Sequence, residues 1–159
     1  MAAKEGVTTM ADIVELEQGV FVAGQLRAAD FDRLAALGVR AVVSNRPDGE
    51  AEGQLDSGAA AAAARRNGLS FRYLPVASVD VAEDGPVADF AAAVAELAGP
   101  VLFYCGTGTR AALLWAQASV ARLGVGETVG IAGRAGFDLS PYADILEERA
   151  AAASLAAAA

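Results

Sequence analysis

The stretch that decides the fold is Val101-Leu102-Phe103-Tyr104-Cys105-Gly106-Thr107-Gly108-Thr109-Arg110. Its first four residues are continuously apolar or aromatic, which is typical of a central strand buried on both faces of a parallel sheet. A single cysteine, two glycines, two threonines and an arginine follow, and a helical pattern begins near Arg110. Ligands of open parallel sheets bind beyond the carboxyl ends of the strands, so the stretch predicts a ligand site at Cys105.

Strand and helix signals alternate on both sides of this stretch. The sequence predicts strands at 20–23, 39–44, 69–76 and 101–104, and helices at about 29–37, 57–66, 87–97, 110–123, 127–134 and 141–152. This alternation predicts an α/β fold with a small, mostly parallel sheet of four to five strands flanked by helices. The length of 159 residues fits one domain over 1–159, with flexible tails expected at 1–10 and 151–159.

The loop after the predicted strand has the composition of an anion-binding site. Gly106 and Gly108 allow a tight turn that directs several N–H groups inward, and the helix after the loop presents its positive end to the same point. Thr107 and Thr109 offer hydroxyl donors, and Arg110 adds a full charge. This surrounding favours the thiolate of the cysteine, which needs no histidine base. We therefore predict Cys105 and Arg110 as catalytic residues and the four residues between them as anion-binding.

Composition excludes several other kinds of site. The chain has no histidine and one cysteine, so Ser-His-Asp and Cys-His mechanisms, His-containing zinc sites and an intramolecular disulfide are ruled out. The net charge is −8, and no basic cluster indicates nucleic-acid binding. The sequence contains neither a signal peptide pattern nor an apolar run long enough to cross a bilayer, so we expect a cytoplasmic protein that does not bind membranes. Nothing indicates a metal or cofactor, and we expect none.

Four charged residues outside the loop are candidate accessory residues. Asp80 and Asp84 lie in an acidic loop before the helix predicted at 87–97, and either carboxyl could protonate a leaving group. Arg46 and Asp48 follow the strand predicted at 39–44, so they face the same edge of the sheet. The three aspartates also have structural alternatives, since Asp84 could cap the helix, Asp80 could be solvated and Asp48 could form a turn.

The loop resembles the active-site loops of cysteine-dependent phosphatases and of rhodaneses. The longer pattern is similar to a bacterial rhodanese-like, protein-tyrosine-phosphatase-like sulfurtransferase family, whose domain also occurs fused to beta-lactamase-like hydrolases and persulfide dioxygenases. The matching segments are 22–25, 45–50, 73–76, 100–110 and 136–139. The resemblance implies a phosphatase-like α/β fold.

The spacing Cys105-x4-Arg110 distinguishes the two chemistries that the resemblance implies. Protein tyrosine phosphatases have Cys-x5-Arg, whereas rhodaneses have the shorter loop, which suits a persulfide sulfur. We therefore expect a sulfurtransferase that carries sulfane sulfur as a Cys105 persulfide. Its substrates would be a small donor such as thiosulfate or glutathione persulfide and a thiol acceptor. A persulfide dioxygenase or another sulfide-oxidising enzyme would be its partner.

Two alternatives stay open: a protein-tyrosine or dual-specificity-like phosphatase acting through a phosphocysteine, and a non-catalytic anion-binding module. Three positions depart from the patterns of the similar proteins. Tyr104 stands where phosphatases carry His, Gly106 where the bacterial family often has Arg, and Ala111 where Ser is usual. These departures weaken the phosphatase hypothesis most and keep the non-catalytic module open.

Overall fold

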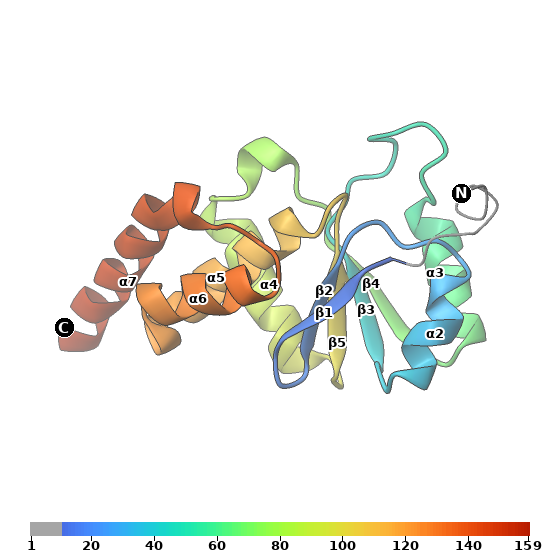
Figure 1. Ribbon diagram of the computed structural model, residues 1–159, viewed down its shortest axis with the longest axis horizontal. Helices are drawn as coiled ribbons and strands as arrows, with labels where there is room; N and C mark the ends of the chain where they lie inside the picture. Colours follow the sequence, from blue (N-terminus) through green and yellow to red (C-terminus); the bar gives the residue numbers. More distant parts are fainter. Residues whose placement is uncertain (1–10) are drawn as a thin grey trace.

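A computed structural model describes residues 11–159, which form one sheet between two layers of helices (Figure 1). The strands are β1 (Ile13–Glu17), β2 (Val20–Ala23), β3 (Ala41–Ser44), β4 (Ser70–Tyr73) and β5 (Val101–Tyr104). Their order is β1-β2-β5-β3-β4, with only β1 antiparallel to its neighbour. The predicted α/β fold with a mostly parallel sheet is confirmed. The predicted flexible tail at 1–10 lies outside the described residues.

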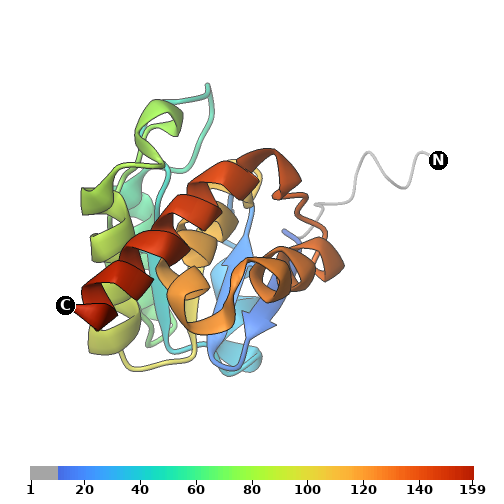
Figure 2. The same ribbon diagram turned by 90° about the vertical axis from the view of Figure 1, so that its left-hand side faces the viewer.

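The helices divide unequally between the two faces of the sheet. On one side lie α2 (Asp30–Ala36) and α3 (Ser57–Arg66), and on the other α4 (Asp84–Glu96) and α5 (Thr109–Leu123) (Figure 1). Two further helices, α6 (Val125–Arg134) and α7 (Ala143–Ala158), pack against α5 (Figure 2). Short 3-10 helices, η1 (Ser78–Asp80) and η2 (Ser140–Tyr142), precede α4 and α7. Within residues 11–159 no helix is both long and apolar enough to span a membrane.

Strand β5 occupies the centre of the sheet, as its apolar sequence predicts. All four of its residues are buried. Val101 and Phe103 belong to the core on the α4–α5 side, whereas Leu102 and Tyr104 belong to the core on the α2–α3 side. Phe103 stacks on Phe90 of α4, with ring centroids 3.9 Å apart. Because both faces of β5 are covered, its carboxyl end is fixed from two sides, and this end carries the loop of interest.

The predicted helix at 87–97 begins three residues earlier, at Asp84. Pro86 lies in its first turn, where a missing N–H costs nothing because that donor has no partner within the helix. Asp84 is thus the first residue of α4 and not its cap. Glu83 occupies the N-cap position, and its side chain makes no capping hydrogen bond to the helix.

Two further differences lie at the ends of the chain. Strand β1 was not among the predicted strands, because Glu15 and Glu17 interrupt its apolar residues. Such charges are common on edge strands, where one side faces solvent. At the other end, where the sequence leaves extension of the last helix or fraying open, α7 continues to Ala158, in keeping with the high helix propensity of alanine.

Candidate active site

The loop of residues 105–108 connects β5 directly to α5, and Gly108 is the N-cap residue of that helix. Cys105 is 1% exposed, and its N–H donates to the Ala23 carbonyl oxygen at 3.3 Å. The Gly108 N–H donates to Cys105 Sγ at 3.1 Å. The sulfur therefore lies at the amino end of α5, where the helix dipole and a loop amide both stabilise negative charge. This is the environment that the sequence predicts.

Two glycines allow the chain segments around the sulfur to approach closely. Gly108 has φ +93°, and a Cβ there would lie 3.0 Å from the Phe137 ring. A Cβ on Gly24, at the end of β2, would lie 3.1 Å from the Gly106 carbonyl oxygen. That oxygen accepts a hydrogen bond from the Gln25 N–H at 3.1 Å. A side chain at Gly24 would thus push against the loop, and one at Gly108 would push against the Phe137 ring.

The two loop threonines are joined by hydrogen bonds. Thr107 Oγ1 donates to Thr109 Oγ1 at 3.2 Å and accepts from the Thr109 N–H at 3.4 Å. Both residues line the pocket above the loop. Their positions place hydroxyl groups beside the first turn of α5, where an anion would bind.

Arg110 is held by a carboxylate that comes from a distant part of the chain. Its Nη1 and Nη2 atoms donate to Glu50 at 2.9 and 3.0 Å, and Nη1 also donates to the Val76 carbonyl oxygen at 2.8 Å. The hydrogen bond from Arg110 lowers the pKa of Glu50 below its usual value of 4.5, and the same bond raises the pKa of Arg110. The guanidinium thus has a fixed orientation before any ligand binds, which reduces the entropic cost of binding.

The Glu50 carboxylate bridges Arg110 to the second arginine of the site, Arg46. Arg46 Nε donates to Glu50 at 2.9 Å, and its Nη1 donates to Gln25 Oε1 at 3.0 Å. The Arg46 guanidinium lies against Gly106, with Nε 3.5 Å from where a Gly106 Cβ would stand. The predicted accessory residue Arg46 is therefore part of the loop's immediate surroundings.

A pocket of about 370 Å³ lies over the loop. Such a volume is at the lower end of ligand-binding pockets. Its lining residues come from the loop, from the ends of β3 and α5, and from the segments around η1 and η2: Arg46, Ser78, Val81, Gly106, Thr107, Thr109, Arg110, Leu113 and Tyr142. The lining is polar and cationic on the loop side and largely apolar opposite it. It can therefore bind an anionic group attached to an apolar or aromatic body.

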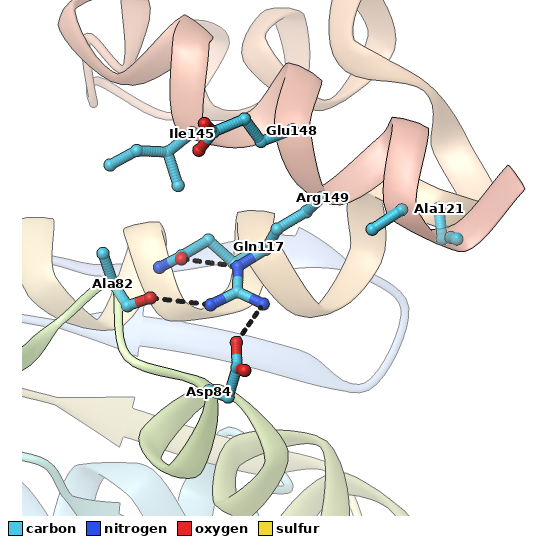
Figure 3. A pocket seen from close by; sticks show the side chains of 9 residues that line it. Ala82, Asp84, Gln117, Ala121, Ile145, Glu148 and Arg149 are labelled. Carbon is cyan, nitrogen blue, oxygen red and sulfur yellow. Dashed lines mark hydrogen bonds and ion pairs between the residues drawn. The ribbon is translucent and has the colours of Figure 1, made fainter. Parts of the chain in front are cut away.

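The two candidate acids lie in different places. Asp80 is an exposed residue at the end of η1, between Ser78 and Val81, which both line the pocket over the loop. Asp84 instead lines a separate pocket of about 430 Å³ and pairs with Arg149 Nη1 at 3.2 Å (Figure 3). Asp84 therefore faces α7. Asp80 lies on the segment next to the pocket over the loop, but its own side chain does not line that pocket.

Asp48 has a structural role in this arrangement. Its carboxylate accepts hydrogen bonds from Ser57 N–H at 2.8 Å and from Ser57 Oγ at 2.7 Å, at the start of α3. Its own N–H donates to the Tyr73 hydroxyl oxygen at 2.9 Å. These contacts favour the turn-forming alternative over a catalytic role, because both carboxylate oxygens of Asp48 already accept hydrogen bonds from Ser57.

Tyr104 precedes Cys105 but lies on the opposite face of the sheet. Burial raises the pKa of Tyr104 above its usual value of 10.0. Its phenol therefore stays neutral at physiological pH and adds no charge near the sulfur. Across residues 11–159 no group of three or more Cys, Asp or Glu side chains is placed to hold a metal ion.

Residues 12–122 match the family described as "Beta-lactamase hydrolase-like protein, phosphatase-like domain". The chain belongs to this family. A beta-lactamase hydrolase-like protein from Xylella fastidiosa (strain 9a5c) is 34% identical over 140 residues, and one from Agrobacterium fabrum is 32% identical over 141 residues. Each alignment covers 87% of this chain but 32% of the relative. The chain thus spans about a third of the length of these curated relatives.

Solved structures give the same picture of the family domain. A candidate phosphatase from Neisseria meningitidis is 32% identical, with a TM-score of 0.80 over 86% of this chain and 97% of that one. The core catalytic domain of a PP-IP phosphatase from S. cerevisiae is 11% identical, with a TM-score of 0.66 over 89% of this chain and 87% of that one. The second likeness shows the fold alone. The family and fold are phosphatase-like, and these comparisons favour the phosphatase alternative over the sulfurtransferase expected from loop length.

Sequence reasoning missed two residues of the site. Glu50 holds both arginines, and its sequence signals are its place at the end of the matching segment 45–50 and its position four residues after Arg46. Tyr142 lines the pocket from η2, far along the chain from Cys105. No sequence pattern links Tyr142 to the loop, because the packing of α6 and α7 on α5 brings η2 to the pocket.

Proposed function

We propose that this chain is a cysteine-dependent phosphatase that hydrolyses a phosphate monoester through a phosphocysteine at Cys105. The observation that carries the proposal is the position of Cys105 Sγ at the amino end of α5, 3.1 Å from the Gly108 nitrogen. The Arg110 guanidinium is fixed at the pocket over the same loop. Membership of a phosphatase-like family supports the proposal.

Two displacements at phosphorus would complete the reaction. In the first, the Cys105 thiolate forms an S–P bond as the bond from phosphorus to the leaving oxygen breaks. In the second, water attacks phosphorus, the S–P bond breaks, and inorganic phosphate and the thiolate are released. Loop N–H groups and Arg110 would stabilise the charge on the non-bridging oxygens in both steps. This chemistry is compatible with a chain that has no histidine.

The leaving oxygen needs a proton, and we assign that proton to Asp80. Asp80 lies on the segment whose residues Ser78 and Val81 line the pocket, whereas Asp84 is paired with Arg149 in another pocket. The Asp80 carboxyl would protonate the leaving oxygen in the first step. The resulting carboxylate would take a proton from the attacking water in the second step.

Hydrolysis of an aryl phosphate by the purified protein tests this proposal. We expect Cys105→Ser to abolish phosphate release. Removal of a general acid lowers rates by about 10²- to 10⁴-fold, so Asp80→Asn should lower kcat strongly for esters with poor leaving groups. Asp84→Asn is the matched control and should retain wild-type kcat. Undiminished hydrolysis by Cys105→Ser would refute Cys105 as the nucleophile. Equal rates for the two Asp variants would refute Asp80 as the general acid.

A second candidate function, sulfur transfer, is favoured by two specific observations. Four residues separate Cys105 from Arg110, and position 111 is a fully buried alanine with no hydroxyl group to offer the thiolate. The thiolate would attack the outer sulfur of thiosulfate or glutathione persulfide, forming a Cys105 persulfide as the donor's S–S bond breaks and sulfite or glutathione thiolate leaves. An acceptor thiolate would then remove that sulfur. A persulfide dioxygenase or another sulfide-oxidising enzyme would be the protein partner under this hypothesis.

Intact mass spectrometry separates the two functions. Incubation with thiosulfate or glutathione persulfide should add the mass of one sulfur atom to the wild type and none to Cys105→Ser if sulfur transfer is correct. A transient phosphate adduct during aryl phosphate turnover would instead support the phosphatase. A protein that forms neither adduct and releases no phosphate would be the non-catalytic anion-binding module.

A further inference from the structure

We propose that Arg46 forms a second anion subsite, so that the preferred ligand carries another acidic group next to the one held by the Cys105 loop. The inference deepens the proposed function and rests on it for the identity of the first anion, a phosphate. The ligand class it names is a small molecule with two adjacent anionic groups, such as a diphosphate or a phosphate ester with a neighbouring carboxylate.

The Arg46 guanidinium is held in place from two sides. Its Nε atom bonds to Glu50 at 2.9 Å, and its Nη1 atom bonds to Gln25 at 3.0 Å. The Gln25 amide is itself fixed, because its Nε2 donates to the Leu26 carbonyl oxygen at 2.8 Å. The Arg46 side chain is 16% exposed. An arginine held this firmly loses little further entropy when a ligand binds.

The remaining nitrogen of this guanidinium is available to a ligand. Among residues 11–159, Arg46 Nη2 has no hydrogen-bond partner, and it lies 3.7 Å from where a Gly106 Cβ would stand. Arg46 and Gly106 both line the pocket over the loop. A Cβ at position 106 would stand in van der Waals contact with this guanidinium, so the glycine lets the Arg46 guanidinium lie next to the loop at the wall of the pocket. An unpaired N–H donor at the wall of a pocket is suited to an anionic oxygen.

Two arginines serve the site, and only one carboxylate pairs with them. Arg46 and Arg110 share Glu50, so these three side chains keep a net charge of about +1, which offsets the charge of the Cys105 thiolate before the α5 dipole is counted. Arg110 lies next to the loop in sequence, whereas Arg46 approaches it from the end of β3. The two guanidinium groups thus reach the pocket from different elements and can hold different groups of one ligand.

Calorimetric titration with inorganic diphosphate and orthophosphate tests the subsite without requiring turnover. In the wild type we expect diphosphate to bind at least about tenfold more tightly, the factor expected for one added charge-assisted hydrogen bond. Arg46→Gln should lose most of this preference, because it should weaken diphosphate binding by about tenfold more than it weakens orthophosphate binding. Arg72→Gln is the matched control, because Arg72 also pairs with a glutamate at 2.9 Å but does not line the pocket. It should keep the preference despite the same loss of charge.

Each result decides between the two proposals. Equal Kd values for both anions in the wild type would overturn the Arg46 subsite and leave the phosphatase proposal intact. A preference that survives in Arg46→Gln would also overturn it, as would loss of the preference in Arg72→Gln. Loss of orthophosphate binding in Arg46→Gln would mean that Arg46 only maintains the loop. If the wild type binds neither anion, the proposed phosphatase function itself fails.

Discussion

At the scale of single residues, the site depends on a position where only glycine fits without strain or steric clash. Gly108 combines a left-handed backbone with contact to the Phe137 ring, whereas Gly19 in the β1–β2 turn has a similar φ of +86° and open space around it. The pair therefore separates two costs of adding a methyl group. Backbone strain applies at both positions, and a steric clash applies at Gly108 alone.

We expect Gly19→Ala to lower the free energy of unfolding by about 1 kcal/mol, through the backbone term alone. Gly108→Ala should lower it by about 2–4 kcal/mol, because the ring must also move. Urea denaturation of both variants measures the two values. Equal losses would mean that the contact with Phe137 does not constrain the loop.

Glu50 gives a prediction about pH. Its hydrogen bond to Arg110 holds the pKa of the carboxyl below 4.5, so the folded state binds this proton more weakly than the unfolded state does. The stabilisation from Glu50 is therefore present above pH 4.5 and is lost as the pH falls through the lowered folded-state pKa. We expect Glu50→Gln to be less stable than the wild type at pH 7 and to approach it below the folded-state pKa. A stability difference that does not change with pH would contradict this assignment.

At the scale of elements, α7 is the anchor of the acidic segment before α4. Arg149 donates to the Ala82 carbonyl oxygen at 2.7 Å, to Gln117 Oε1 at 2.8 Å and to Asp84 at 3.2 Å (Figure 3). Gln117, in α5, is 4% exposed and also donates to the Val81 carbonyl oxygen at 2.8 Å. Three elements thus meet at one guanidinium, and the segment that they hold carries Asp80.

Arg149→Ala should lower the free energy of unfolding by about 1–3 kcal/mol, since it leaves the buried oxygen of Gln117 without a donor. It should also speed amide hydrogen exchange in residues 78–84. Glu148→Gln is the control, because Glu148 lines the same pocket without a hydrogen bond to this segment. Exchange in residues 78–84 that is equally slow in both variants would refute the claim that Arg149 holds this segment in place.

At the scale of the whole molecule, β5 joins two cores that otherwise lie on opposite faces of the sheet. Leu102 contributes to the core on the α2–α3 side, and Trp115, the only tryptophan, contributes to the other. If the sheet makes the protein one cooperative unit, a substitution that destabilises one core must also lower the unfolding midpoint of the other.

Leu102→Ala tests this cooperativity. We expect a loss of about 2–5 kcal/mol, the range for truncation of a buried leucine. The denaturation curve followed by Trp115 fluorescence should shift to the same midpoint as the curve followed by far-ultraviolet circular dichroism. Different midpoints for the two signals would mean that the two cores unfold separately.

The sequence by itself determined the strand–loop–helix unit around Cys105, the α/β class and the central place of β5. These features depend on local patterns: a continuous apolar run, glycines at a tight turn and helical periodicity. The tertiary structure alone decided that Glu50 bridges two arginines, that Asp84 faces α7 instead of the loop, and that Tyr142 reaches the pocket. Those contacts join residues far apart in the chain, and their partners are set by how helices pack on the sheet. A carboxylate's sequence position does not reveal which arginine it will meet, whereas a glycine beside a cysteine after a buried strand already constrains the backbone there.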